Sequence, residues 1–328
     1  MRLSKKLGLI LAVIVIITAA VIRYLFVVPQ VPQPLLQGSL QRGELSSAGL
    51  ERRFSYSIPD ELSQGAPVVI IFHGSRGTGD RIRQATAFAF DALADQHGFI
   101  VAYPDAYARH WNDCLAVGAY AAKEIEVDDV GFVRSLLIFL RDQHGVDLGR
   151  VLSVGLSGGG QMSLRLAMEA PELIRGAVAI AANMPAPNNL VCEPVGQSVA
   201  VMIINGTDDR INPFDGGEVG WQGRFGRRGA VKSSVESAQY WVALAGYESG
   251  PFQHRYPDNV TEDNSVATRM VWADSGLREI SLITVHGGGH TIPHPKQQFP
   301  RFLGPVNRDF SAADEIWRFF QRELDQPE

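Results

Sequence analysis

The sequence has few of the residue patterns that mark metal, nucleotide or nucleic-acid sites. Only two of its 328 residues are cysteines, Cys114 and Cys192, and their separation does not fit a zinc-binding motif. The formal net charge of −5 gives no electrostatic reason to expect a nucleic-acid partner. The glycines at 158–160 do not extend to the G-x-G-x-x-G pattern of dinucleotide-binding loops, and neither a phosphate loop nor an internal repeat is present. We therefore expect no metal, no cofactor and no nucleic-acid partner.

The N-terminus carries a long apolar run. Residues 1–6 are basic, and residues 7–28 are apolar except for Thr18 and Arg23. A basic start followed by an apolar run is typical of an export signal, and a helix that spans a bilayer needs about 20 such residues. Residues 1–28 are therefore predicted to be an uncleaved membrane anchor, with the rest of the chain outside the cytoplasm. Cleavage after Ala20, which would release a secreted protein beginning at Val21, is the alternative.

Two further segments follow this apolar run. Residues 29–49 are rich in proline and glutamine and have no apolar periodicity, which predicts a semi-rigid linker. Residues 50–328 are predicted to form the folded domain. The chain is 45% hydrophobic and 20% charged, a composition that suits one large globular domain with an appendage.

The folded region alternates apolar strands with helical segments. Strands that are apolar throughout are typical of a parallel sheet covered on both faces. The alternation predicts an α/β fold class, with a mostly parallel, doubly wound sheet and helices on both faces. Ligands of such sheets bind beyond the C-terminal ends of the strands. The expected strands are residues 54–58, 67–72, 99–103, 151–154, 173–180, 199–204 and 280–285, and the expected helices are residues 78–96, 127–144, 158–168, 233–246 and 311–324.

A G-x-S-x-G pattern lies at the junction between one strand and one helix. Gly155 and Gly159 flank Ser157, after the apolar residues 151–154. A sharp strand–turn–helix junction needs small residues, and it holds the serine at the tip of the turn above the sheet. We therefore predict that Ser157 is a nucleophile, with the N–H of Gly158 directed at the same place from the positive end of the helix. The alternative is an ordinary glycine-rich loop with a capping serine.

A serine nucleophile needs a base, and the base needs an orienting acid. Two loops that follow strands supply candidates, one after residues 199–204 and the other after residues 280–285. A carboxylate and a histidine at such strand ends can both reach Ser157. The candidate acids are Asp208, Asp209 and Asp215, and the candidate bases are His286, His290 and His294.

Four short stretches carry a resemblance to a known family. They are His73-Gly-Ser75, Gly155–Gly159, Gly206–Pro213 and Gly287–Pro293. Together they resemble the exported esterase family that groups polyhydroxybutyrate depolymerases with feruloyl and acetylxylan esterases. The similarity covers about residues 50–324. The resemblance implies the α/β-hydrolase fold and a serine esterase that hydrolyses carboxylic esters.

The resemblance also selects one candidate for each catalytic role. It implies that Asp209 is the acid and His290 the base, which completes a Ser-His-Asp triad with Ser157. It implies further that the backbone N–H of Ser75 joins that of Gly158 in an oxyanion hole. Such a hole stabilises the negative charge that develops on the carbonyl oxygen of the substrate.

Loops at the same edge of the sheet carry three more predictions. Trp111 is predicted to bind substrate by stacking on an aromatic acyl group or a sugar ring, the alternative being a half-buried surface residue. Residues 216–229 form either a flap over the site or a solvated loop. Cys114 and Cys192 lie in loops that leave this edge, and disulfides persist in exported proteins. We therefore predict a disulfide between them, the alternative being two isolated cysteines.

The expected function is hydrolysis of carboxylic esters through an acyl-enzyme on Ser157. The expected substrates are small or plant-cell-wall-type esters (feruloyl or acetyl) or hydroxyalkanoate esters, because no polymer-binding module is attached. A serine peptidase or an acyltransferase on the same fold is the enzymatic alternative. A non-catalytic binding protein of the cell envelope is the non-enzymatic one.

Overall fold

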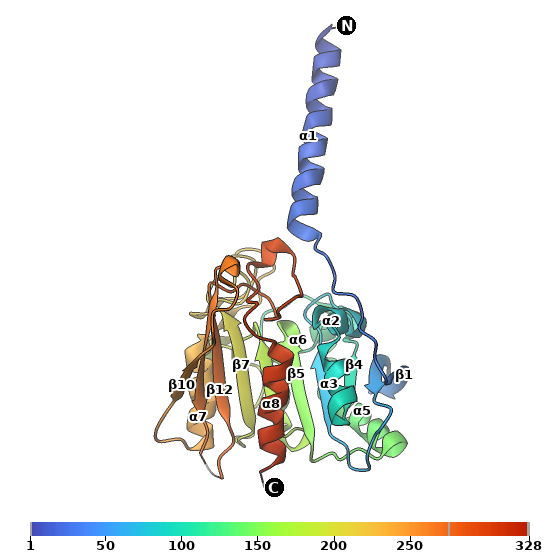
Figure 1. Cartoon of the computed structure of the whole chain (residues 1–328), viewed down its shortest axis with the longest axis vertical. Helices are drawn as coiled ribbons and strands as arrows, with labels where there is room; N and C mark the ends of the chain where they lie inside the picture. Colours follow the sequence, from blue (N-terminus) through green and yellow to red (C-terminus); the bar gives the residue numbers. More distant parts are fainter. Residues whose placement is uncertain (1, 275, 327–328) are drawn as a thin grey trace.

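The chain forms a ten-stranded sheet covered by helices, with one helix standing away from this body (Figure 1). The computed structural model describes residues 2–274 and 276–326, with side chains from residue 11 onward. The strands are β1 (Ser39–Ser47), β2 (Leu50–Ile58), β3 (Val68–Phe72), β4 (Ile100–Pro104), β5 (Val151–Leu156), β6 (Gly176–Ile180), β7 (Ala200–Gly206), β8 (Gly217–Glu218), β9 (Ala230–Val231), β10 (Phe252–Arg255), β11 (Val266–Trp272) and β12 (Ile280–His286). The α-helices are α1 (Arg2–Phe26), α2 (Gly79–Ala85), α3 (Ala89–His97), α4 (Ala121–Glu124), α5 (Asp129–His144), α6 (Gly158–Glu169), α7 (Ser234–Ala245) and α8 (Ala312–Leu324).

The strand order places the predicted site loops along one edge of the sheet. The order is β1-β2-β4-β3-β5-β6-β7-β12-β11-β10. The central strands from β4 to β12 run parallel, whereas β1, β2, β11 and β10 pair antiparallel at the two sides. Because parallel strands end at the same edge, the loops that follow β3, β5, β7 and β12 gather there. The predicted fold class, a mostly parallel doubly wound sheet with helices on both faces, is confirmed.

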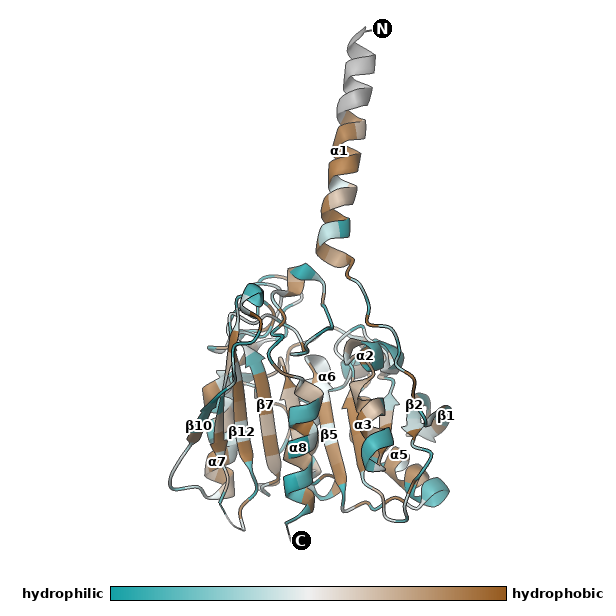
Figure 2. Ribbon diagram, viewed as in Figure 1, coloured by the Kyte–Doolittle hydropathy of each residue, from teal (hydrophilic) through white to brown (hydrophobic). Residues whose placement is uncertain are grey.

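Alternate residues of the central strands divide the core into two apolar layers. On β3, Val68 and Ile70 pack in the layer that contains α5, α6 and α7. Their neighbours Val69 and Ile71 pack in the layer that contains α2, α3 and α8. Figure 2 shows these central strands as mostly hydrophobic. Burying each such side chain stabilises the fold by roughly 1.5–3 kcal/mol, so the sheet is a rigid base for the loops at its edge.

Helix boundaries follow local capping signals in most places. Ser233 Oγ accepts from the N–H of Glu236, and the Glu236 carboxylate accepts from the N–H of Ser233, so the predicted capping box opens α7. The predicted helix 78–96 is wrong in one respect, because it is broken into α2 and α3. Ala87 and Phe88 have φ angles of 54° and 59° there, which a continuous right-handed helix does not allow.

The predicted linker is shorter than residues 29–49. Its last part forms β1, which pairs residue by residue with β2 across a tight turn at Ala48 and Gly49. Both turn residues have positive φ, 49° and 77°, which is the backbone of a two-residue hairpin turn. The folded domain therefore begins at Ser39 rather than near Leu50.

The helix α1 covers the predicted membrane anchor, of which the part up to residue 10 lies outside the residues whose side chains are described. Apolar side chains on the rest of α1 are exposed, and Figure 2 shows that most of the coloured part of this helix is hydrophobic. In the part of the chain that the structure describes, no helix has the length and apolar character needed to cross a membrane. At its end, Phe26 packs 4.7 Å from the ring of Phe302, and Arg301 lies over the ring of Tyr24.

Candidate active site

The serine of the G-x-S-x-G pattern sits on a sharp turn between β5 and α6. Ser157 has φ 55° and ψ −118°, a conformation that costs a non-glycine residue about 1–3 kcal/mol. A Cβ on Gly155 would lie 2.0 Å from the carbonyl oxygen of Gly159, and one on Gly159 would lie 2.2 Å from that of Phe72. Both positions therefore require glycine, and the strain at Ser157 is imposed by this close packing. The geometry is the one that the sequence pattern predicts.

Asp209 and His290 form a buried hydrogen-bonded pair. The Oδ2 atom of Asp209 lies 2.7 Å from Nδ1 of His290, and the Asp209 side chain has no exposed surface. The Oδ1 atom accepts from the backbone N–H groups of Ile211 (2.7 Å) and Asn212 (2.9 Å). A carboxylate held by two amide N–H groups is fixed in orientation. This leaves Oδ2 to hold the imidazole.

The other candidate acids and bases do not take part in this pair. Asp208 is exposed and accepts from the hydroxyl of Thr207, and Asp215 is exposed. His286 is exposed and forms a hydrogen bond with the hydroxyl of Thr268. The Nδ1 atom of His294 accepts hydrogen bonds from the backbone N–H groups of Lys296 and Gln297. The candidate residues that the structure brings together are Asp209 and His290.

Close backbone packing joins the loop of the acid to the loop of the base. A Cβ on Gly206 would lie 2.2 Å from the carbonyl oxygen of Gly288, and one on Gly289 would lie 2.2 Å from that of Leu303. The N–H of His290 donates to the same Leu303 carbonyl at 2.7 Å. Gly206 is therefore needed for the approach of the two loops, and Gly289 for the packing of the base loop against Leu303.

Ser75 and Gly158 lie side by side, as the predicted oxyanion hole requires. A Cβ on Gly158 would lie 2.8 Å from Oγ of Ser75 and 3.4 Å from its backbone nitrogen. Gly158 is the first residue of α6, where backbone N–H groups are unpaired and the helix dipole is positive. This placement gives a site for a negatively charged oxygen.

His73 fixes the loop that carries Ser75. It is 1% exposed; its Nδ1–H donates to the carbonyl of Gly74 (2.8 Å), and its Nε2 accepts from the N–H of Ala106 (3.0 Å). Burial lowers the pKa of His73 below its usual value, and the nearby Arg109 and His110 add to this effect. The ring is therefore neutral and acts as a structural link between the loops that follow β3 and β4.

The prediction that Trp111 binds substrate is wrong. Trp111 is 1% exposed, its Nε1–H donates to the carbonyl of His73 (2.9 Å), and its ring meets that of Phe72 edge-on at 5.0 Å. The packing of this large ring beneath the loop, rather than at its surface, could not be predicted from the residue type. Trp111 supports the backbone on which Ser75 lies.

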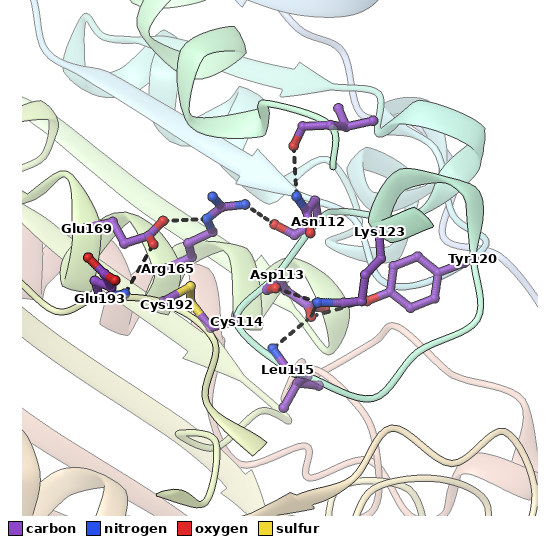
Figure 3. Close-up of a disulfide and its surroundings, with 11 residues drawn as sticks. Asn112, Asp113, Cys114, Leu115, Tyr120, Lys123, Arg165, Glu169, Cys192 and Glu193 are labelled. Atoms are coloured by element: carbon purple, nitrogen blue, oxygen red, sulfur yellow. Dashed lines mark hydrogen bonds and ion pairs between the residues drawn. A yellow bond between two sulfur atoms is a disulfide. The ribbon is translucent and has the colours of Figure 1, made fainter. Parts of the chain in front are cut away.

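The predicted disulfide between Cys114 and Cys192 is confirmed. The two Cα atoms are 5.1 Å apart, and 78 positions separate the residues in the sequence. Figure 3 shows the disulfide beside Asp113 and Arg165. The bond ties the loop after β4 to the segment between β6 and β7.

One charged group beside Ser75 and Gly158, Arg228, was not among the predicted site residues. It lies near the end of the glycine- and arginine-rich residues 216–229, which were noted only for their composition. Its Nη1 donates to Oγ of Ser75 (3.0 Å), and its Nη2 donates to Asp113 (2.5 Å) and to the hydroxyl of Tyr120. Residues 216–229 are thus fixed to the loops that carry Ser75 and Asp113.

In residues 2–274 and 276–326, no cluster of histidine, cysteine, aspartate and glutamate side chains is arranged to hold a metal ion. The groups gathered at the sheet edge are a strained serine, a buried histidine–carboxylate pair and converging N–H donors. This set is suited to nucleophilic acyl transfer.

Comparisons with known proteins agree with this geometry. Residues 54–185 match the family described as esterase PHB depolymerase. The chain is 29% identical over 263 residues to "Putative esterase NocK" of Nocardia uniformis subsp. tsuyamanensis, covering 77% of this chain and 73% of the relative. It is 24% identical over 278 residues to feruloyl esterase B of Neurospora crassa, covering 78% of this chain and 88% of the relative.

A solved structure shows the same fold. The acetyl xylan esterase from Aspergillus awamori superposes with a TM-score of 0.58 at 18% sequence identity, covering 87% of this chain and 99% of that one. This likeness shows the fold, which is that of α/β-hydrolases. The resemblance to the family of polyhydroxybutyrate depolymerases and feruloyl and acetylxylan esterases, predicted from four short stretches, is confirmed.

Proposed function

We propose that this protein is a serine carboxylic-ester hydrolase with Ser157, His290 and Asp209 as its catalytic triad. The similarity to esterases supports the reaction class. The observation that carries the residue assignment is the buried Asp209–His290 pair, on loops that follow parallel strands at the sheet edge of Ser157. A histidine held through Nδ1 by a carboxylate presents its Nε2 as a base.

The reaction proceeds through an acyl-enzyme. Ser157 Oγ attacks the ester carbonyl carbon while Nε2 of His290 takes the hydroxyl proton, which gives a tetrahedral intermediate with a negative oxygen. The N–H groups of Ser75 and Gly158 stabilise that oxygen. The intermediate collapses, the C–O bond to the alcohol breaks, and the protonated His290 gives its proton to the departing alcohol.

Water then completes the cycle. His290 takes a proton from a water molecule while the oxygen of that water attacks the acyl carbon. The same oxyanion site holds the second tetrahedral intermediate. Collapse breaks the bond to Ser157 Oγ, which regains a proton from His290, and releases the carboxylic acid. Asp209 stays ionised throughout and stabilises the imidazolium of each half-reaction.

The substrates that we propose are small or plant-cell-wall-type esters, feruloyl or acetyl, or hydroxyalkanoate esters. The relatives supply this range, since they include feruloyl esterase B, acetylxylan esterase A and a poly(3-hydroxybutyrate) depolymerase. Peptide hydrolysis is the alternative outcome that the substrate panel below distinguishes from ester hydrolysis.

We also propose that the catalytic domain works outside the cytoplasm. The basic and apolar start of the chain and the Cys114–Cys192 disulfide both support export, because disulfides persist in oxidising compartments. Fractionation of the native host should place the domain outside the cytoplasm with both thiols oxidised. Recovery in the cytoplasm with two free thiols would contradict export.

The test of the reaction compares a variant of Ser157, the N-cap of α6, with a variant of Ser163 in the middle of the same helix. Ser157→Ala should lower kcat/KM for p-nitrophenyl acetate, methyl ferulate and 3-hydroxybutyrate dimers on the order of 10³-fold or more, because the covalent step is lost. Ser163→Ala removes another buried hydroxyl on α6 and should keep the activity. Turnover of these esters by Ser157→Ala near the wild-type rate would overturn the nucleophile. Cleavage of peptide anilides but not of esters would overturn the reaction class.

A further inference from the structure

Arg228 is held rigidly at the edge of the candidate oxyanion site. Its backbone N–H donates to the carbonyl of Val219 (3.0 Å), and its carbonyl accepts from the side chain of Asn189 (2.9 Å). The guanidinium stacks over the ring of Tyr120, 4.8 Å from the centroid, and the side chain is 14% exposed. Figure 3 shows Tyr120 and Lys123 converging on Asp113, the carboxylate that Arg228 pairs with. A side chain fixed in this way loses little entropy when it binds a ligand.

The hydrogen bonds of Arg228 do not use all of the N–H donors of its guanidinium. A guanidinium carries five N–H groups. Nη2 uses its two on Asp113 and Tyr120, and Nη1 uses one on the neutral hydroxyl of Ser75. Among the described residues, nothing accepts from the buried Nε, and the second N–H of Nη1 has no acceptor in the hydrogen bonds given above. Buried donors normally have partners, so this arrangement points to a missing acceptor.

The spare Nη1 donor lies beside the candidate oxyanion donors of Ser75 and Gly158. A Cβ placed on Gly158 would be 3.3 Å from Nη1 of Arg228 and 3.4 Å from the nitrogen of Ser75. Arg228 therefore shares one small space with both candidate oxyanion donors. The leaving alcohol must face His290, which protonates it, whereas Arg228 is on the side of Ser75 and Gly158. A ligand group that reaches Arg228 therefore belongs to the acyl part of the ester.

The charges around this space favour an anion. Asp113 is the carboxylate that pairs with both Arg228 and Lys123, so one negative charge faces two positive ones. Burial raises the pKa of Tyr120, which keeps its hydroxyl neutral. Burial lowers the pKa of His110. The positive charges of Arg228 and of the exposed Arg76 lower it further. The local charge is thus positive, although the whole chain has a net charge of −5.

We propose that Arg228 determines acyl specificity by binding a carboxylate on the acyl chain, so that half-esters of short dicarboxylic acids are the preferred substrate class. The inference rests on the proposed ester hydrolysis at Ser157. The chemistry of each step is unchanged, since the guanidinium only binds the far carboxylate and keeps its proton. An arginine–carboxylate hydrogen bond is stronger than one between neutral groups and is directional.

The experiment compares two ethyl esters whose acyl chains have the same number of carbons, monoethyl succinate and ethyl butyrate, by release of ethanol. The wild-type enzyme should prefer monoethyl succinate by roughly 10-fold or more in kcat/KM. Arg228→Gln should lower kcat/KM for monoethyl succinate by roughly 100-fold, mainly by raising KM, and that for ethyl butyrate by only about 3-fold. The readout is the ratio of the two substrates in each variant.

Two further variants keep the result decisive. Arg227→Gln removes the neighbouring arginine, which is 62% exposed and pairs with Glu218, and should keep the wild-type ratio. The double variant Arg228→Gln/Asp113→Asn avoids leaving the buried Asp113 with the more distant Lys123 as its charged partner, and should show the same lost preference if the single variant folds poorly.

Equal activity of the wild type on both esters, or an equal loss on both in Arg228→Gln and in the double variant, would overturn the inference. The second result would make Arg228 a support for Ser75 and nothing more. Failure of the proposed function is recognised separately, because Ser157→Ala would then hydrolyse ethyl butyrate at the wild-type rate.

Discussion

Two buried arginines of this protein differ in how completely their guanidinium groups are hydrogen-bonded. One belongs to the scaffold and the other to the candidate site. Arg269, on β11, is 9% exposed in its side chain and directs Nη1 to Glu315 (3.1 Å), Nη2 to Glu279 (2.5 Å) and Nε to Ser281 (3.3 Å). Arg228, beside Ser75 and Gly158, pairs with the carboxylate of Asp113 and has no acceptor for Nε among the described residues. All three nitrogens of Arg269 have acceptors within the fold, whereas the Nε of Arg228 has none among the described residues.

The difference indicates where the chain gives up stability for binding. Removing a charge from water costs several kcal/mol, and good partners are needed to offset that cost. The Arg269 cluster has them and connects β11 and β12 with α8. The strained Ser157 and the under-satisfied Arg228 lie instead at the sheet edge, where a ligand supplies what is missing. We therefore expect changes at the edge to affect activity and changes in the Arg269 cluster to affect stability.

The largest expected effect separates the two adjacent aspartates of the acid loop. Asp209→Asn should lower kcat about 10³- to 10⁴-fold, because the amide leaves His290 in the wrong tautomer. Asp208→Asn, which changes an exposed carboxylate, should stay within about 3-fold of the wild type. Steady-state kinetics on one ester measures both. A greater loss in Asp208→Asn would move the acid by one residue.

The next effect concerns stability in the scaffold cluster. Arg269→Met leaves Glu279 and Glu315 buried with fewer partners and should lower the free energy of unfolding by about 3–5 kcal/mol. The kcat of the enzyme that remains folded should not change. The exposed pair of Arg134 and Glu172 is the control, because Arg134→Met should cost less than about 1 kcal/mol. Urea denaturation gives both values, and a loss of kcat in Arg269→Met would break the division between scaffold and site.

Removing the disulfide should have an intermediate effect on both regions. A Cys114→Ala/Cys192→Ala variant releases a loop of 78 positions and should lose about 2–4 kcal/mol of stability. Because Asp113 precedes Cys114 and pairs with Arg228, KM should rise under conditions where the protein is still folded. Thermal unfolding and KM are measured on the same preparation. An unchanged KM would show that the disulfide acts on the scaffold alone.

The smallest effect is the pH dependence that His73 contributes. Burial holds the folded-state pKa of His73 below the usual histidine value of 6.5, so the unfolded chain takes up a proton first as the pH falls. The contribution of neutral His73 to the free energy of unfolding is complete above the usual histidine pKa. It is lost as the pH falls from there toward the folded-state pKa. His73→Asn should therefore show a shallower fall in the free energy of unfolding between about pH 7 and pH 5. An identical slope would mean that His73 does not titrate in this window.

The sequence predicted those parts of the protein that depend on local rules. Gly155 and Gly159 identify the turn at Ser157, because no larger residue fits there, and apolar runs identify the buried parallel strands. The resemblance to esterases selected Asp209 from three aspartates, and the structure shows the reason: its neighbours in sequence face solvent while it faces His290. These features are set by a few adjacent residues.

The features that were missed depend on contacts between distant residues. Trp111 was expected at the surface and is buried under the loop of Ser75, since its indole N–H meets the carbonyl of His73. Arg228 is positioned by Asp113 and Tyr120, more than a hundred residues earlier in the chain. The strand β1 was assigned to the linker because its side chains are mostly polar, and its pairing with β2 is what orders it. No local pattern carries this information.

The central claim is that Ser157 is the activated nucleophile, and covalent labelling tests it most directly. A fluorophosphonate probe should react with one residue, and peptide mass mapping should place the adduct on Ser157. His290→Ala should slow the labelling by at least about 100-fold, and Ser157→Ala should abolish it while the Cys114–Cys192 disulfide stays intact. An adduct on any other residue, or ester hydrolysis by an enzyme that the probe does not label at Ser157, would contradict the account.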